Sequence, residues 1–268
     1  MNSKIVIVIV VLLVILFLLR NIIYIFLYAK FNGLQTGRNF FNFAYMFNEI
    51  FIDKEYDIGI SFDNRVVFDI GANMGLFSVW INKNFQNVKV HCFEPIKEVF
   101  DVAKHNINVT NKNNNKYVLN NIGLSNQNTN TEITYYPYAN GLSTINNQIN
   151  KKLQYHSMLE QMVLPFVTNN KENVIIKLEK ATDYIKNNNI TEIDICKIDV
   201  EGHELDVLLG FEEFINDVKI FILEVEHYVP ENLEKVKNLL TNFDVKNVST
   251  QDATVCVKII AKNKNVNF

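Results

Sequence analysis

The stretch "VVFDIGANMGLFSVW", Val66 to Trp80, decides the fold of this chain. Apolar and β-branched residues lead to Asp69, a turn with Gly71 and Gly75 follows, and an amphipathic run completes the stretch. A short apolar run, a glycine-containing turn and then a periodic apolar run predict a buried strand, a tight turn and a helix. Such a unit begins an α/β sheet.

Strand-like and helix-like segments alternate through the rest of the chain. Strands are predicted at 66–70, 89–93, 117–120, 132–138, 194–200, 220–225 and 254–261, and helices at 76–84, 97–108, 205–215 and 231–240. This alternation predicts a mainly parallel sheet with helices on both faces, which binds ligands beyond the carboxyl ends of its strands. We expect the mixed, aromatic segment 31–62 to be a connector that packs on this domain.

The N-terminus has a different character. Residues 5–19 read "IVIVIVVLLVILFLL", then Arg20 and Asn21 interrupt an apolar run that continues to Ala29. The first run alone would rise ~22 Å as a helix, less than the roughly 30 Å hydrocarbon core, whereas the continuation is long enough. We expect residues 1–30 to be an uncleaved, single-pass membrane anchor with Arg20 reaching toward the interface, on an undetermined side of the membrane. A cleaved signal peptide is the alternative, but no small-residue cleavage site follows the run directly.

The composition excludes several classes of protein. The 268 residues are 48% hydrophobic and 21% charged with a net charge of -3, so there is no broad basic surface and nucleic acid is not an expected partner. Cys92, Cys196 and Cys256 lie apart, each in an apolar strand-like run. They are predicted to be buried thiols rather than zinc ligands or a disulfide framework.

The glycine turn excludes two phosphate-binding motifs. A dinucleotide fingerprint would have glycine at positions 71, 73 and 76, but Asn73 and Leu76 occupy two of them, and no Gly-Lys-Ser/Thr follows for a P-loop. Asp69 would also repel a pyrophosphate at the helix N-terminus. A carboxylate there suits a cationic nucleotide such as S-adenosylmethionine, whose amino group it can receive. The alternative is that Gly71 and Gly75 only make a tight turn.

A second acid strengthens the nucleotide interpretation. Glu94 ends the second predicted strand in "CFEPIKE", roughly 20 residues after Gly71, where an acid accepts hydrogen bonds from ribose hydroxyls in nucleotide-binding sheets. The alternative is a solvated glutamate at a strand end.

The most distinctive stretch is "ICKIDVEGHELDVLLGF", Ile195 to Phe211, in which a buried strand leads to Asp199, Glu201 and His203. Three interpretations remain open. In the first, Asp199 contacts the methyl donor or substrate hydroxyl and Glu201 or His203 accepts a proton. In the second, the three residues bind a metal ion. In the third, the acids stabilise the start of a helix.

Four stretches together resemble the FkbM-type methyltransferases: "FDIGANMGLFS", "CFEPIKEVFDVAKHNI", "LNNIGLSNQNTNTEITYYPYANGLSTI" and "IDICKIDVEGHELDVLLGF". The resemblance covers residues 68–226, and "KIDVEG-x-E" is its most specific element. It implies a class I methyltransferase (Rossmann-like) domain over residues 63–268, with a seven-stranded sheet whose last strand is antiparallel. It also implies S-adenosylmethionine as cofactor and methylation of an oxygen on a sugar, polyketide or lipid-like acceptor.

The resemblance also implies roles for individual residues. Those expected at the cofactor are Asp69, Gly71, Asn73 and Gly75 at its methionine end, Glu94 at the ribose, Asn121 near the adenine, and Asp199. Asp199 and Glu201 are expected to face the reacting centre, and Ser143 the acceptor. We take Asp199, Glu201 and His203 as the candidate catalytic residues and expect no metal.

The function that follows is S-adenosylmethionine-dependent O-methylation of a sugar, glycolipid or other small acceptor. The alternatives are a noncatalytic membrane-anchored scaffold or binding protein that retains the fold, and a metal-dependent hydrolase.

Overall fold

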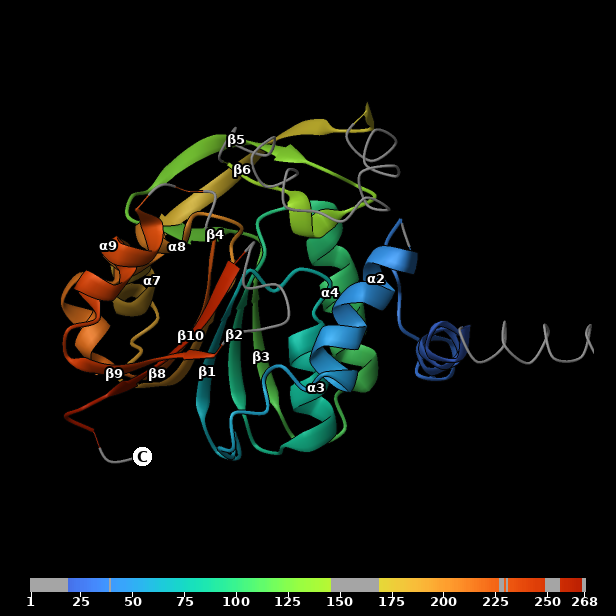
Figure 1. Cartoon of the computed structure of the whole chain (residues 1–268), viewed down its shortest axis with the longest axis horizontal. Coiled ribbons are helices and arrows are strands. Elements are labelled where there is room, and N and C mark those ends of the chain that lie inside the picture. The colour runs from blue at the N-terminus through green and yellow to red at the C-terminus, as the bar shows by residue number, and fades with distance from the viewer. Residues whose placement is uncertain are drawn as a thin grey trace, which may run out of the picture.

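A seven-stranded sheet organises the protein, which we describe from a computed structural model (Figure 1). The structure describes residues 19–38, 40–145, 169–226, 229, 231–248 and 256–266. The strand order is β3-β2-β1-β7-β8-β10-β9, and β10 is antiparallel to both of its neighbours. The strands are β1 (Val66–Ile70), β2 (Lys89–Phe93), β3 (Lys116–Asn120), β7 (Ile193–Ile198), β8 (Val218–Glu226), β9 (Phe243–Val248) and β10 (Cys256–Asn263). The predicted mainly parallel sheet with an antiparallel last strand is confirmed.

Helices cover both faces of this sheet because its central strands are apolar on both sides. Val67 and Ile195 point into one core, whereas their neighbours Phe68 and Cys196 point into the other. The first face carries α3 (Leu76–Asn84) and α4 (Lys97–Thr110). Outside α3 lie α2 (Phe40–Phe47) and the π-helix η1 (Asn48–Ile52). The second face carries α7 (Ala181–Asn187), α8 (Glu204–Phe211) and α9 (Asn232–Leu239).

A second, three-stranded sheet lies above the carboxyl ends of the parallel strands (Figure 1). Its order is β4-β6-β5, with β4 (Gly123–Ser125), β5 (Thr129–Tyr135) and β6 (Glu172–Lys180). The sequence predicted a strand at 132–138 with the alternation of an antiparallel strand; the strand found there is β5, which is antiparallel to β6 and begins and ends three residues earlier. The sequence analysis did not predict β4, β6, α7 or β9. The predicted helix 205–215 ends at Phe211, because Glu212 has a φ of 47° and a 3-10 helix follows to Asp217.

The described residues between 19 and 62 pack against the domain. Residues 19–31 are helical, and Phe43, Phe47, Tyr56 and Phe62 are buried in the core on the α3 side. Among the described residues, no helix is long and apolar enough to cross a membrane. Most of the predicted anchor, residues 1–18, lies outside the described residues, so the anchor remains an expectation.

The small sheet is held in place by the close approach of β4 to α8. A Cβ built on Gly210 would lie 1.9 Å from the carbonyl oxygen of Ser125, so the helix backbone reaches β4 only because residue 210 has no side chain. Cys92 and Cys196 are buried thiols as predicted, whereas Cys256 is half-buried.

We expect Gly210→Ala to destabilise the protein. Glycine to alanine in a helix ordinarily stabilises by up to ~1 kcal/mol, whereas forcing a methyl group into a closed contact costs typically about 1–3 kcal/mol. The sign of the change in unfolding free energy, measured by urea denaturation, therefore tests this contact. A stabilised variant would show that α8 and β4 do not approach as described.

Candidate active site

A cavity of about 1030 Å³ lies where the sequence predicted a ligand, beyond the carboxyl ends of β1, β2 and β7. The small sheet and the loop from Ala139 to Ile145 form one side of it, and α2, η1 and the segment that follows form another. A cavity of this size holds a nucleotide-sized ligand and leaves room for part of a second molecule.

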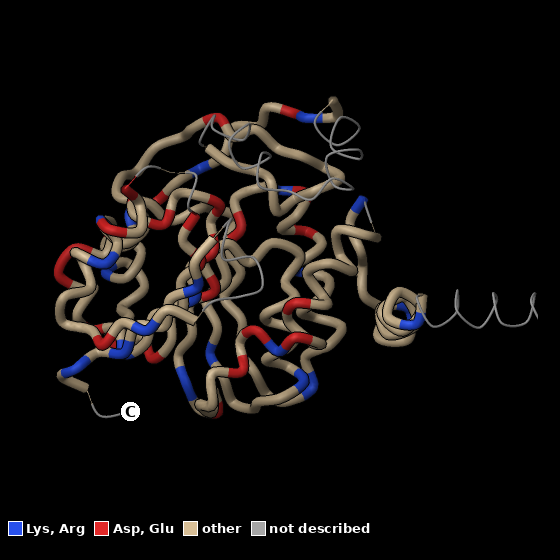
Figure 2. The backbone as a smooth tube through the Cα atoms, viewed as in Figure 1, with Lys and Arg blue, Asp and Glu red and all other residues tan. Residues whose placement is uncertain are grey.

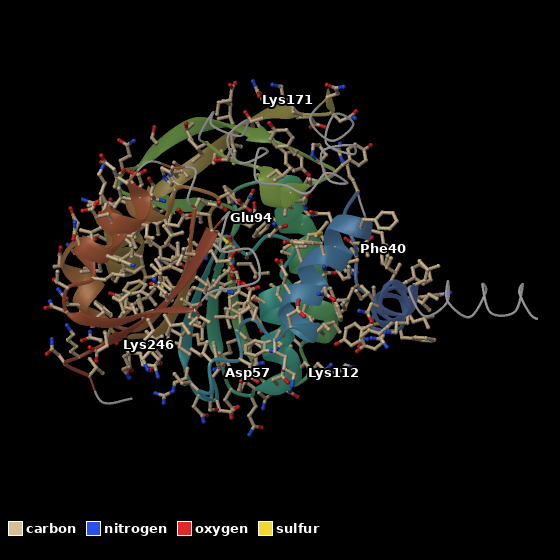
Figure 3. The ribbon with its side chains drawn as sticks, viewed as in Figure 1. Phe40, Asp57, Glu94, Lys112, Lys171 and Lys246 are labelled. Atoms are coloured by element: carbon tan, nitrogen blue, oxygen red, sulfur yellow. The ribbon has the colours of Figure 1, made fainter. Side chains whose placement is uncertain are left out.

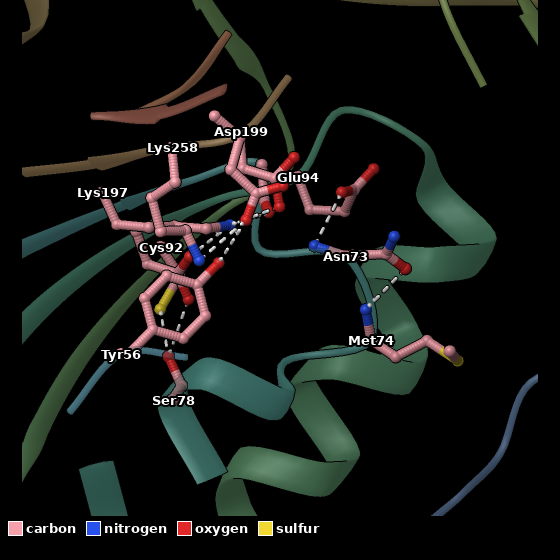
Figure 4. A network of polar contacts seen from close by, with 12 residues as sticks. Tyr56, Asn73, Met74, Ser78, Cys92, Glu94, Lys197, Asp199 and Lys258 are labelled. Atoms are coloured by element: carbon pink, nitrogen blue, oxygen red, sulfur yellow. Dashed lines mark hydrogen bonds and ion pairs between the residues drawn. The ribbon is translucent and has the colours of Figure 1, made fainter. Parts of the chain in front are cut away.

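The glycine turn after β1 brings two strand ends into contact. Gly71 has a φ of 77°, and a Cβ there would lie 1.8 Å from the carbonyl oxygen of Asp199. Asn73, also with positive φ, donates its backbone N–H to Glu94 Oε2 at 3.0 Å (Figure 4). Gly71 and Asn73 both line the cavity. Gly75 faces Ala103 of α4 instead, at 3.1 Å from the position of an added Cβ, so its lack of a side chain serves helix packing.

Glu94 lies in the cavity wall at the end of β2. Its carboxylate accepts hydrogen bonds from the backbone N–H groups of Asn73 and Ile96, at 3.0 and 2.9 Å. Burial raises the pKa of Glu94 to about 7, although both hydrogen bonds act in the opposite direction. The Glu94 carboxyl group therefore gains or loses its proton near neutral pH. A ligand in the cavity can contact it, because Glu94 lines the cavity.

Asp69 is beneath the cavity rather than in its wall. Its side chain is fully buried, accepts a hydrogen bond from Ser78 Oγ at 3.0 Å, and lies 3.4 Å from Lys197 Nζ. Burial raises the pKa of Asp69 above its usual value, and Lys197 opposes that shift. The structure thus places the carboxylate of the predicted cofactor-binding Asp69 against a lysine, not in the cavity.

That lysine, Lys197 of β7, is a residue that the sequence analysis missed. Its ammonium group donates a hydrogen bond to the carbonyl oxygen of Gly71 at 2.6 Å and lies 3.4 Å from carboxylate oxygens of both Asp69 and Asp199 (Figure 4). Burial acts to lower the pKa of Lys197, but Asp199, Asp69 and Glu224 together raise it above its usual value. A single lysine inside the apolar strand "IDICKI" was the signal, since a fully buried lysine requires partners.

The three candidate catalytic residues all line the cavity. Asp199 follows β7 directly, and its backbone N–H donates to the carbonyl oxygen of Ile70 at 3.1 Å. Glu201 has a φ of 55°, and its carbonyl oxygen accepts a hydrogen bond from Thr144 Oγ1 at 2.8 Å. Asp199 and Glu201 therefore hold fixed backbone positions at the end of the strand.

His203 differs from the two acids because both of its ring nitrogens have partners. Nε2 lies 3.0 Å from Ser125 Oγ of β4, and Nδ1 lies 3.2 Å from a carboxylate oxygen of Asp206. Burial lowers the pKa of His203, and Asp206 opposes that effect. This geometry links α8 to the small sheet.

Of two further predicted site residues, Ser143 lines the cavity and Asn121 does not. Ser143 lines the cavity, and its Oγ accepts the backbone N–H of Tyr136 at 3.1 Å. Asn121 is not among the cavity-lining residues; its side-chain amide donates to the carbonyl oxygens of Glu94 and Pro95, at 2.9 and 3.0 Å. Asn121 therefore holds the backbone that carries Glu94.

A second polar group lines the cavity, and the sequence does not predict it, because the group joins residues of β8 and β10 to residues of the segment 31–62. Lys258 of β10 is buried, forms ion pairs with Glu55 and with Glu224 (3.2 Å), and lies 4.4 Å from the centre of the Tyr56 ring. The Tyr56 hydroxyl lies 3.4 Å from Glu224. Burial, together with Glu55 and Glu224, raises the pKa of nearby Glu49 to about 8.

The seven-stranded sheet, with β10 antiparallel between β8 and β9 and a cavity above its carboxyl edge, has the class I methyltransferase fold. The model of the methyltransferase FkbM domain matches residues 69–247, and the chain belongs to this family. It is an S-adenosylmethionine-dependent methyltransferase.

The chain is similar to several individual proteins. "Methyltransferase 1" of Beauveria bassiana is 26% identical over 170 residues, which cover 63% of this chain and 67% of the relative. The 31-O-demethyl-FK506 methyltransferase FkbM of Streptomyces tacrolimicus is 27% identical over 184 residues, 63% of this chain and 68% of the relative. Among solved structures, the precorrin-6y C5,15-methyltransferase of Geobacter metallireducens is similar with a TM-score of 0.46 and 11% identity, over 81% of this chain and 88% of that one.

The residues present fit the cofactor. Gly71 lines the cavity, and the carboxylates of Glu94 and Asp199 give the adjoining wall the negative charge that a sulfonium and an ammonium group require. Across the described ranges, no three His, Cys, Asp or Glu side chains lie together as a metal site would require.

We expect Lys197→Met to destabilise the protein by about 3–5 kcal/mol, because it leaves the buried carboxylate of Asp69 without a counter-charge. Urea denaturation measures this loss. The matched control is the double variant Asp69→Asn, Lys197→Met, which removes both charges and should recover a large part of the stability. Equal stability of the single and double variants would contradict the ion pair.

Proposed function

We propose that this methyltransferase transfers a methyl group to a hydroxyl oxygen of a sugar, glycolipid or other small acceptor. The observation that carries the proposal is one continuous cavity that contains Glu94, Asp199 and Glu201 and extends to the group around Lys258. One end of the cavity suits the cofactor, and the other offers a separate set of polar side chains to an acceptor.

In this proposal, the cofactor occupies the end formed by the first two strands. Glu94 accepts hydrogen bonds from the ribose hydroxyls, while Gly71, Asn73 and Asp199 surround the methionine part. Lys197 orients Asp199, and Asp69 keeps Lys197 charged, so Asp69 acts through its neighbour rather than by contact. Gly75 and Asn121 hold the turn and the strand end in position.

When bound, S-adenosylmethionine supplies a methyl group on a sulfonium, which is already reactive. The main contribution of the protein is therefore to hold the acceptor oxygen in line with that group. Asp199 or Glu201 accepts the hydroxyl proton as the new bond forms. His203 is a weaker candidate than in the sequence-based hypothesis, because both ring nitrogens are engaged by Ser125 and Asp206.

The charge of the cavity supports a neutral acceptor. Nine acidic residues line it against two lysines, and Lys258 is already paired with Glu55 and Glu224. A phosphate or carboxylate near the reacting centre would meet net repulsion. Hydroxyl groups, in contrast, can donate hydrogen bonds to these carboxylates, as a sugar does. The relative from Streptomyces tacrolimicus is a 31-O-demethyl-FK506 methyltransferase, a name that denotes transfer to an oxygen.

A membrane attachment is part of the proposal. It is supported by the sequence of residues 5–19, which contains no polar side chain, and by the continuation of this apolar run to residue 29.

We expect wild-type protein to bind S-adenosylmethionine in a calorimetric titration and to label a hydroxyl-bearing fraction when acceptor pools are supplied with a radiolabelled methyl donor. Binding without any labelled product across sugar and glycolipid pools would count against the proposed acceptor class. Absence of heat at millimolar cofactor would favour the noncatalytic scaffold.

We expect one of two variants, Asp199→Asn or Glu201→Gln, to lose the catalytic base and to lower kcat by about 10²–10⁴-fold. The amide keeps the shape of the side chain but cannot accept the proton. Single-turnover rates at saturating cofactor measure the effect. Asp101→Asn is the matched control, since it removes an exposed carboxylate of α4 outside the cavity. Wild-type rates in both test variants would refute the assignment of a carboxylate base.

We expect the affinity for S-adenosylmethionine to increase with pH up to about 7 and then to level off. Below its pKa of about 7, Glu94 is protonated and is a poor acceptor for two ribose hydroxyls; above it, the carboxylate is ionised and accepts both. Glu94→Gln should weaken binding at pH 8 by about tenfold or more and should remove this pH dependence. Calorimetric dissociation constants of both proteins between pH 5.5 and 8.5 provide the comparison, and parallel profiles would argue against Glu94 as the ribose ligand.

A further inference from the structure

The helix of residues 19–31 is apolar around most of its circumference, yet only a narrow stripe of it is covered by protein. Ile25 and Ala29, one helical turn apart, are buried against the domain. The large side chains on its other sides are exposed: Phe26 is 52% and Phe31 81% exposed, and Ile22, Ile23, Tyr24 and Leu27 are also exposed. A helix that is apolar all round is stable when an apolar medium surrounds it, whereas a helix in water carries polar residues on its outer face.

The exposed apolar surface continues onto α2. Phe26 contacts Phe40 with 5.8 Å between ring centres, and Tyr24 contacts Phe47 with 6.3 Å. Figure 3 shows Phe40 beside this helix, on the side of the molecule away from β8 and β9. Phe41 of α2 is 68% exposed and extends the surface. We call the exposed side chains Ile22, Ile23, Phe26, Leu27, Phe31 and Phe41 the apolar patch.

The charges of this helix indicate the kind of surface that would cover the patch. Residues 19–31 contain no acidic side chain, so this helix is only tan and blue in Figure 2. Arg20 and Lys30 are exposed near its two ends. Basic side chains at the ends of an apolar helix, with tyrosines beside them, are typical of a segment at the boundary between acyl chains and anionic headgroups. The sequence that precedes the helix is the apolar run of residues 5–19.

We propose that the apolar patch contacts the acyl chains of an anionic bilayer and holds the rim of the cavity at the membrane surface. The connection is α2 itself, because Asn42, Tyr45 and Met46 of this helix line the cavity, and Tyr45 is also exposed. The inference rests on the proposed membrane attachment and adds to it. Attachment through residues 1–18 alone would leave the domain free to turn, whereas contact through the patch fixes its orientation and brings the cavity close to acceptors that reside in the bilayer.

The test uses the full chain with tryptophan as a depth probe. Phe31→Trp and Phe41→Trp place an indole in the patch, and Ile175→Trp places one at a matched exposed apolar position on β6 of the small sheet. The native Trp80 is buried and gives a constant background. Each protein is mixed with vesicles of phosphatidylcholine and phosphatidylglycerol, with or without bromine on the acyl chains, because bromine quenches only an indole that touches it.

The expected result is a blue shift and a loss of most of the added emission for Phe31→Trp and Phe41→Trp in brominated vesicles, with Ile175→Trp unchanged. Vesicle co-sedimentation without quenching at positions 31 and 41 would overturn this inference but leave the proposed membrane attachment intact. Failure of the wild-type chain to co-sediment would overturn both. A concentration-dependent dimer that Phe31→Glu or Phe41→Glu abolishes, without lipid quenching, would show that a second copy of the chain covers the patch.

Discussion

The site depends on the interactions of the Lys197 ammonium group. This group joins the turn after β1, through the carbonyl oxygen of Gly71, to the carboxylates of Asp69 below and Asp199 beside it. In a buried environment these charges are costly unless all of them are compensated, so the three side chains and the turn can adopt few other arrangements. Gly71 also packs so closely against the carbonyl oxygen of Asp199 that no side chain fits at residue 71, which restricts the turn further. The ends of β1 and β7 that line the cavity are thereby fixed before any ligand binds.

The end of the cavity that we propose for the acceptor is built differently. Its walls come from the segment of residues 40–58 and from β8 and β10, which are far apart in the sequence. Lys258 joins them, because Glu55 belongs to the N-terminal segment and Glu224 to β8. In a fold whose sheet is shared by many methyltransferases, the element added before the first strand is suited to determine what is methylated.

Nine acidic residues line the cavity, and burial raises the pKa of two of them toward neutrality. Glu94 has a pKa of about 7 and Glu49 of about 8, in each case chiefly because of burial. In the proposed binding mode, a positively charged cofactor beside Glu94 would lower the pKa of Glu94 by favouring its ionised form. Cofactor binding would then release a proton from Glu94.

The sequence by itself determined the alternating order of strands and helices, because buried parallel strands such as 66–70 and 89–93 read as apolar runs and amphipathic helices follow a period of 3.6 residues. It also determined the family and the position of Glu94, Asp199 and Glu201 at strand ends. Only the tertiary structure decided that Asp69 pairs with Lys197, that Gly75 and Asn121 support the backbone, and that residues within 42–58 line the cavity. These outcomes depend on which side chains meet across strands and layers, and local periodicity carries no information about such long-range pairing.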